Sequence, residues 1–154
     1  MRQFHKGRRL LLLCEQKIRT VQISIATTMA RRDQLIETIQ QLEEQMRSIE
    51  KSLHSQQLTA VEVTKAEIFI QRRQQVLLLH LSQQLAVERV VQFEELDKVN
   101  IALAQFHTQL AYLKRREMKF TEWTHRSKRE WMTQQDTKTE NEQQDDVPWR
   151  FGTP

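Results

Sequence analysis

Residues 11–53 read LLLCEQKIRTVQISIATTMARRDQLIETIQQLEEQMRSIEKSL, and apolar side chains recur in them at alternating steps of three and four residues. The positions reached from the first leucine are Leu11, Cys14, Ile18, Val21, Ile25, Thr28, Arg32, Leu35, Ile39, Leu42, Met46, Ile49 and Leu53. Ten of these thirteen are Leu, Ile, Val or Met, and two more are small. A repeat sustained over six heptads predicts the buried seam of a coiled-coil helix.

Arg32 is the one charged residue in this seam. One interpretation is a snorkelling side chain, whose aliphatic stem covers the seam while the guanidinium reaches water. The other is a polar residue that fixes the register of the coiled coil by facing an acid on the partner strand. The sequence leaves both open.

Glycine and proline are almost absent from the chain. Its 154 residues contain two Gly and two Pro, at Gly7, Pro148, Gly152 and Pro154, so that residues 8–147 contain neither. Turns draw on these two residues for their special dihedral angles. A β-sandwich, a barrel, a dinucleotide-binding fold or a glycine-rich phosphate loop is therefore excluded, and helix is the expected state.

A second helix is predicted after a turn at about residues 54–59, where the heptad pattern stops. Thr59-Ala60-Val61-Glu62 matches the S/T-x-x-E capping box, which satisfies the first free amides of a helix. The second helix is expected to run from about Thr59 to Gln135. Its seam is clear at Leu96, Val99, Leu103, Phe106, Leu110 and Leu113. It is blurred at residues 76–81, which indicates either a shift of heptad phase or a third surface docking there.

The short connection predicts that the two helices lie antiparallel. We therefore predict an all-α protein in which residues 1–135 form an antiparallel coiled-coil hairpin, with the first helix at about 8–55. Folding at the predicted turn pairs Leu53 with the region of Val63, Ile39 with Leu77 and Leu11 with Gln105. In this register the second helix extends about 25 residues beyond the N-terminus of the first, at a rise of 1.5 Å per residue.

Residues 136–154 are expected to form a disordered acidic tail, because five Asp and Glu stand among Gln, Thr and Asn without periodicity. The tail ends in the apolar segment Val147-Pro148-Trp149-Arg150-Phe151. That segment is either a frayed terminus or a short peptide that docks on a partner.

No catalytic or metal-binding constellation is present in the sequence. The five histidines (His5, His54, His80, His107 and His125) lack i,i+3 or i,i+4 pairing, and Cys14 is the only cysteine. We predict that the protein is not an enzyme and needs no cofactor or metal. The longest apolar runs, Leu10–Leu13 and Val76–Leu79, are too short to cross a bilayer, so no membrane insertion is expected.

Residues 112–131 read YLKRREMKFTEWTHRSKREW and combine aromatic with basic side chains. At about 100° per residue, Phe106, Leu113, Phe120 and Trp131 extend the apolar stripe, whereas Arg115, Lys119, Arg126 and Arg129 lie on the opposite side. Residues 114–132 carry seven basic and three acidic side chains, a net charge equal to the +4 of the whole chain.

Three interpretations of this segment remain open. If the second helix overshoots the first, Phe120, Trp123 and Trp131 lack an intramolecular cover and form a protein-docking end. Alternatively, the face is merely solvated and its aromatics pack on the ten N-terminal residues. Nucleic-acid binding is the third, although no helix-turn-helix, zinc or RNA-binding signature accompanies the basic residues.

Two segments resemble a known family. One is Leu58-Thr59-Ala60-Val61-Glu62 with Ala66-Glu67-Ile68-Phe69-Ile70-Gln71-Arg72-Arg73-Gln74; the other is Tyr112-Leu113-Lys114-Arg115-Arg116-Glu117, Lys119-Phe120-Thr121-Glu122-Trp123 and Arg126-Ser127-Lys128-Arg129. Together with the length and the predicted hairpin, they resemble the small coiled-coil central-stalk proteins of bacterial type III secretion. This is the SpaM/YscO group, with its flagellar relative FliJ, and the resemblance covers about residues 1–146.

The resemblance implies a non-enzymatic central stalk on the cytoplasmic side of a bacterial injectisome. Such a stalk inserts into the hexameric secretion ATPase, stimulates it and couples it to the export gate, and it is linked to escorting export chaperones. The implied ATPase-facing residues are Arg8, Arg9, Arg115, Lys119, Phe120, Trp123, Arg126, Arg129 and Trp131. The implied gate-facing tip contains Leu58, Val61, Ile68 and Phe69. A monomeric hairpin that binds no nucleic acid is expected.

Two other functions fit the composition. One is a generic coiled-coil adaptor or secretion chaperone, for which a dimer of extended chains would replace the monomeric hairpin. The other, which fits less well, is a basic helical protein that binds nucleic acid, for which binding should weaken steeply with salt.

Overall fold

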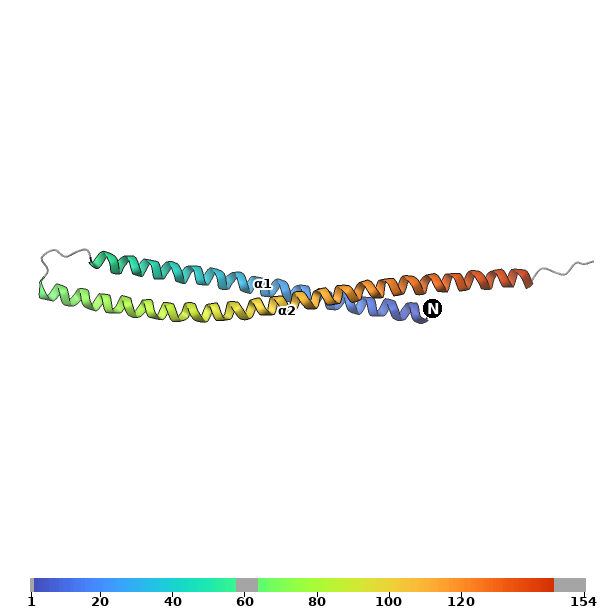
Figure 1. Ribbon diagram of the computed structural model, residues 1–154, viewed down its shortest axis with the longest axis horizontal. Coiled ribbons are helices and arrows are strands. Elements are labelled where there is room, and N and C mark those ends of the chain that lie inside the picture. Colours follow the sequence, from blue (N-terminus) through green and yellow to red (C-terminus); the bar gives the residue numbers. More distant parts are fainter. Residues whose placement is uncertain (1, 58–63, 146–154) are drawn as a thin grey trace, which may run out of the picture. The chain divides into compact units, whose positions relative to one another are not determined.

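Two long α-helices make up the described part of the chain (Figure 1). The computed structural model describes the backbone of residues 2–57 and 64–145, and the side chains of 4–56 and 64–142. α1 spans Arg2–Gln57 and α2 spans Lys65–Asp145. No strand occurs in these ranges, so the predicted all-α fold is confirmed. Good helix formers and the lack of Gly or Pro between residues 8 and 147 explain the helix lengths.

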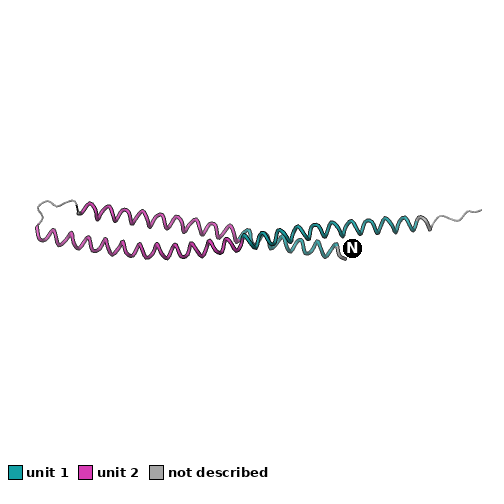
Figure 2. Tube along the Cα trace, in the orientation of Figure 1, with its two compact units in different colours: residues 1–23, 107–154 teal, residues 24–106 magenta. Residues whose placement is uncertain are grey.

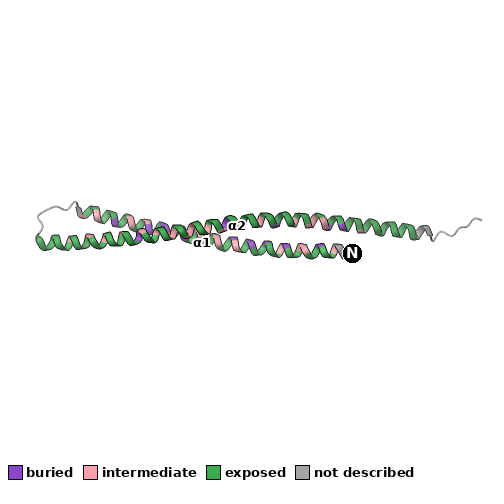
Figure 3. Cartoon of the chain, turned by 60° about the horizontal axis from the view of Figure 1, so that its bottom comes forward, coloured by how far each residue is buried: buried purple, intermediate pink, exposed green. Residues whose placement is uncertain are grey.

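The seam predicted for the first helix is confirmed. None of its thirteen positions is exposed, and eight of them, including Cys14, Ile25 and Leu35, are buried. Figure 3 shows the buried and half-buried positions recurring along helices whose remaining surface is exposed. Leu35 is the most deeply buried of the large side chains, with 2% of its surface exposed.

α2 carries one continuous seam. From Gln71 to Trp131, positions spaced alternately by four and three residues are all buried or half-buried. The phase of this repeat does not change at residues 76–81, where Leu78 faces inward while Val76, Leu77, Leu79 and Leu81 remain exposed. The apolar residues that blur this part of the sequence therefore lie on another face of the helix.

The described helices divide into two units, which Figure 2 shows in separate colours. Unit 1 contains residues 1–23 and 107–154, and unit 2 contains residues 24–106. In unit 1, the Cys14 thiol donates a hydrogen bond to the carbonyl oxygen of Leu113, with Sγ and O 3.4 Å apart. In unit 2, the Glu43 carboxylate lies 4.0 Å from the Arg89 guanidinium. Within each unit, α1 and α2 run antiparallel, as predicted.

The register differs from the predicted one. Ile39 was expected opposite Leu77, but Leu42 and Ile49 cluster with Leu85. Likewise, Leu11 was expected opposite Gln105, whereas Cys14 lies against Leu113. In both units, residues of α1 therefore contact a later part of α2 than expected. The predicted register was wrong because the turn was expected too early in the chain, at about residues 54–59.

The core of unit 2 is narrow. Its buried cluster is supplemented by the partly buried side chains of Met46, Leu53 and Leu78, all from seam positions. Arg32 also occupies a seam position, and its guanidinium pairs with Asp33 of the same helix, with Nη2 and Oδ1 3.2 Å apart. This pairing favours the snorkelling interpretation over a register-fixing contact across the hairpin.

A capping box does begin α2, but it is not the predicted one. The Thr64 backbone N–H donates to Oε2 of Glu67 at 2.9 Å, and the Ile68 N–H donates to the Thr64 carbonyl at 3.1 Å. The hydrogen bond from the Thr64 N–H, followed by that from its hydroxyl, lowers the pKa of Glu67. Thr64-Lys65-Ala66-Glu67 is thus an S/T-x-x-E box. The predicted box at residues 59–62 lies outside the described residues.

The helix ends also differ from the predicted ones. α1 begins at Arg2 rather than near Arg8, and it continues through His54–Gln57, where a turn was expected to start. α2 continues to Asp145 instead of ending near Gln135, so residues 136–145 of the expected disordered tail are helical. Residues 8–147 contain no Pro or Gly, and this explains the extension of α2. Residues 146–154 lie outside the described ranges.

Candidate functional site

In unit 1, the N-terminal part of α1 packs on the aromatic and basic segment of α2. A groove between them is lined by apolar side chains and two cations: Leu10, Leu13, Cys14, Lys17, Leu113, Arg116 and Phe120. Cys14 and Leu113 form its buried floor. Phe120 is half-buried here, so the expectation that it lacks an intramolecular cover was wrong.

Gly7 allows the two helices to approach each other closely in this unit. A Cβ atom placed on Gly7 would lie 2.5 Å from Cγ2 of Thr124 and 3.0 Å from the ring of Trp123. The Trp123 ring is therefore covered by α1, again contrary to the expectation of an uncovered docking end. The contact of Trp123 with Gly7 agrees with the alternative in which the aromatics pack on the N-terminal residues.

The Thr124 hydroxyl, next to this contact, is satisfied within α2. Thr124 and Ser127 are buried, and the Thr124 hydroxyl lies within hydrogen-bond distance of the Phe120 and Thr121 carbonyl oxygens, at 2.9 and 2.8 Å. A threonine that bonds to its own helix leaves its methyl group to face the neighbouring helix. The small side chains let the backbones approach, and this explains why a glycine is found in a seam position.

We predict that Gly7→Leu separates the first two turns of α1 from α2. Its side chain has no room beside Thr124 and Trp123, so the helices must move apart or α1 must fray. Trp123 fluorescence should shift to longer wavelength, and amide exchange should accelerate at residues 4–10. Lys6→Leu, an exposed neighbour, is the matched control. Unchanged exchange in Gly7→Leu would contradict the packing described.

The cations expected to face a partner are all exposed. They are Arg8, Arg9, Arg115, Lys119, Arg126 and Arg129. The three aromatic residues of the same predicted site, Phe120, Trp123 and Trp131, are half-buried. The predicted site therefore separates into a solvent-facing basic surface and aromatic side chains that belong mainly to the seam of α2.

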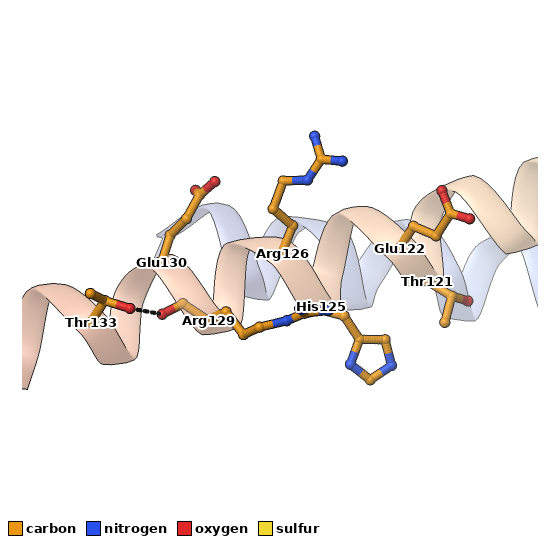
Figure 4. A pocket seen from close by; sticks show the side chains of 7 residues that line it. All are labelled: Thr121, Glu122, His125, Arg126, Arg129, Glu130 and Thr133. Atoms are coloured by element: carbon orange, nitrogen blue, oxygen red, sulfur yellow. Dashed lines mark hydrogen bonds between the residues drawn. The ribbon is translucent and has the colours of Figure 1, made fainter.

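Part of the basic surface forms a shallow pocket along one side of α2 (Figure 4). It is lined by Thr121, Glu122, His125, Arg126, Arg129, Glu130 and Thr133. Glu122, Arg126 and Glu130 follow one another at four-residue spacing and project from the same side of the helix. The Thr133 hydroxyl donates to the Arg129 carbonyl at 3.0 Å. Acidic and basic groups alternate here, so the surface can complement a partner of mixed charge.

Arg116 is a candidate residue that the sequence analysis did not single out. Its guanidinium carbon lies 5.7 Å from the centre of the Tyr112 ring and 5.4 Å from that of Phe120. Cation–π contacts of this kind hold an arginine in place while leaving its donors free for an acidic partner. The signal was available, because Tyr112, Arg116 and Phe120 are spaced i, i+4 and i+8 on a helix.

Only half of the predicted gate-facing tip falls within the described residues. Ile68 and Phe69 are exposed at the start of α2, whereas Leu58 and Val61 lie outside the described ranges. Ile68 and Phe69 belong to unit 2, whereas the basic surface belongs to unit 1.

In the described part of the chain, no cluster of three or more His, Cys, Asp or Glu side chains is placed to hold a metal ion. Neither α1 nor α2, over the residues described, offers a stretch apolar and long enough for a bilayer crossing.

A comparison with known families gives a match that covers most of the chain. A family model described as the Salmonella surface presentation of antigen gene type M protein matches residues 5–147. No curated protein and no solved structure matches the chain. The match includes both helices and both segments on which the resemblance was based. The chain therefore belongs to the SpaM family of type III secretion proteins.

Proposed function

We propose that this protein is a non-enzymatic central stalk of a bacterial type III secretion apparatus. In this proposal it works on the cytoplasmic side, inserts into the hexameric secretion ATPase, stimulates hydrolysis and couples the ATPase to the export gate. Escort of export chaperones belongs to the same proposal. Membership of the SpaM family supports the link to secretion.

The observation that carries the proposal is the basic surface of unit 1. Arg115, Lys119, Arg126 and Arg129 are exposed along α2, while their apolar neighbours hold α2 against α1. A ring of ATPase subunits presents the same kinds of polar groups repeatedly around its centre. Exposed ion pairs are individually weak, so a charged helical surface can bind such a ring without being locked in one position.

Stimulation requires that the stalk bind some subunit states better than others. A ligand shifts a conformational equilibrium only by its differential affinity for the states. Arg115, Lys119, Arg126 and Arg129 lie on one side of α2, so subunits at different positions around the ring face different charges. This asymmetry is the physical means by which the stalk would favour one subunit conformation at a time.

The proposal is tested by adding the purified chain to the purified hexameric ATPase of the same secretion system. We expect ATP hydrolysis to rise and to saturate near one chain per hexamer. A hydrolysis rate that does not respond to the chain at any concentration, with binding also absent in sedimentation, would refute the ATPase part of the proposal. Family membership would be unaffected by that result.

A further inference from the structure

α2 of unit 2 has a second apolar face that no part of unit 2 covers. Phe69, Val76 and Val87 are 72%, 64% and 66% exposed. At about 100° per residue these three lie within roughly 20° of one another. The seam residues Leu78, Leu85 and Leu96 point about 180° away from them. The helix is thus apolar on two opposite sides, and α1 occupies only one.

The composition around this face is equally unusual. Residues 74–87 contain no Asp, Glu, Lys or Arg, although 29% of the whole chain is charged. Further exposed apolar residues extend the face at Ile70, Leu77, Leu79, Val90 and Val91. Exposed apolar surface that is contiguous in this way marks an interaction site. A helix in a hairpin needs only one apolar stripe, so the second stripe requires another partner.

The charges at the two ends of the face indicate what that partner is. Arg73 precedes His80 by seven residues, and Glu88 follows it by eight. Both side chains are exposed, and both lie on the same flank of the Phe69–Val87 stripe. In an antiparallel pair of identical helices, residues on the same flank face each other across the two-fold axis. With that axis near His80, Arg73 of each copy meets Glu88 of the other.

We propose that this face binds a second copy of the same chain, α2 against α2, antiparallel about a two-fold axis near His80. The same register lays Phe69 of one copy along Val91 of the other, and brings Val76 and Val87 of opposite copies within about one helical turn. Residues 74–87 lie in the middle of this contact and contain no Asp, Glu, Lys or Arg, so no like charges oppose each other there. The contact is about 33 Å long at 1.5 Å per residue, which suits a reversible dimer and not an obligate one. This inference does not depend on the proposed function, and it departs from the expected monomer.

The first test is the mass in solution, measured by sedimentation equilibrium on the full chain from about 1 μM to 1 mM. We expect the average mass to rise from 18.5 kDa toward twice that value. Val76→Glu with Val87→Glu should abolish the rise without changing helicity, because both side chains are exposed. Met118→Glu, at a residue that is 64% exposed in unit 1, is the matched control and should dimerise normally.

The second test is a charge swap that only antiparallel self-pairing predicts. Arg73→Glu alone and Glu88→Arg alone should each weaken the dimer about tenfold, because each places like charges together twice. The double variant should restore the original affinity. A chain that stays monomeric throughout the concentration range overturns the proposal, as does association that survives Val76→Glu with Val87→Glu. A double variant no better than the single ones overturns the antiparallel register.

Discussion

Replacing Leu35 by aspartate should unfold unit 2 at temperatures at which the parent chain is fully helical. Leu35 has the lowest exposed fraction of the large side chains, and a carboxylate in its place would be desolvated in a contact only two helices thick. Loss of the packed side chain and burial of an unpaired charge together cost about 4 kcal/mol or more. For a unit of this size, the midpoint of thermal unfolding should fall by about 20 °C.

The neighbouring residue provides a matched control for this experiment. Ile36 is 39% exposed, so Ile36→Asp introduces the same charge in the same turn of α1 without placing it in the seam. Circular dichroism at 222 nm should show this control melting close to the parent. Equal melting of Leu35→Asp and Ile36→Asp would mean that the seam of unit 2 is not where the structure places it.

The seam was predictable because periodicity is a property of α1 alone. Every third or fourth residue from Leu11 to Leu53 must lie on one side of a helix, whatever the partner is. The same holds for α2 between Leu96 and Leu113, where the predicted positions are all buried or half-buried. Between Val76 and Leu81 periodicity was ambiguous, because two apolar faces overlap in the sequence and only packing against α1 separates them.

The register was not predictable, because it depends on the connection and not on either helix. Two S/T-x-x-E motifs follow each other, at Thr59–Glu62 and Thr64–Glu67, and both satisfy the rule for a capping box. The sequence analysis used the first, whereas the described helix begins at the second, with Thr64 as its N-cap. Because both helices are uniform repeats, a shift of the turn displaces every contact between them without disturbing either seam.

The consequences of that shift reach the candidate site. In the predicted register α2 overshoots α1 from about Gln105, which leaves Phe120 and Trp123 uncovered. In the observed register Cys14 reaches Leu113, and Gly7 reaches Trp123. The basic residues were placed correctly on the exposed side, because that depends on the helical wheel of α2. Their separation from the aromatic side chains depends on the register and could not be anticipated.

Reversing two charges of the basic surface, Arg115→Glu with Arg126→Glu, should abolish stimulation of the secretion ATPase while leaving the fold intact. Both residues are exposed, so neither substitution removes packing. The double variant changes the local charge of residues 114–132 from +4 to about 0. Each new glutamate replaces a cation of the proposed contact, so it should repel the acidic groups of the ATPase that the arginine would attract. We expect a loss of at least tenfold in apparent affinity for the ATPase.

The control for this experiment must match the change in net charge without altering the part of α2 that belongs to unit 1. Arg19→Glu with Lys51→Glu does so, since both residues are exposed on α1 and lie outside the proposed surface. Stimulation should persist in the control and disappear in Arg115→Glu with Arg126→Glu, with circular dichroism equal in both. If both double variants stimulate as the parent does, the basic surface of α2 is not the ATPase contact. If both fail, the ATPase senses only the overall charge of the chain, and the site assignment is equally wrong.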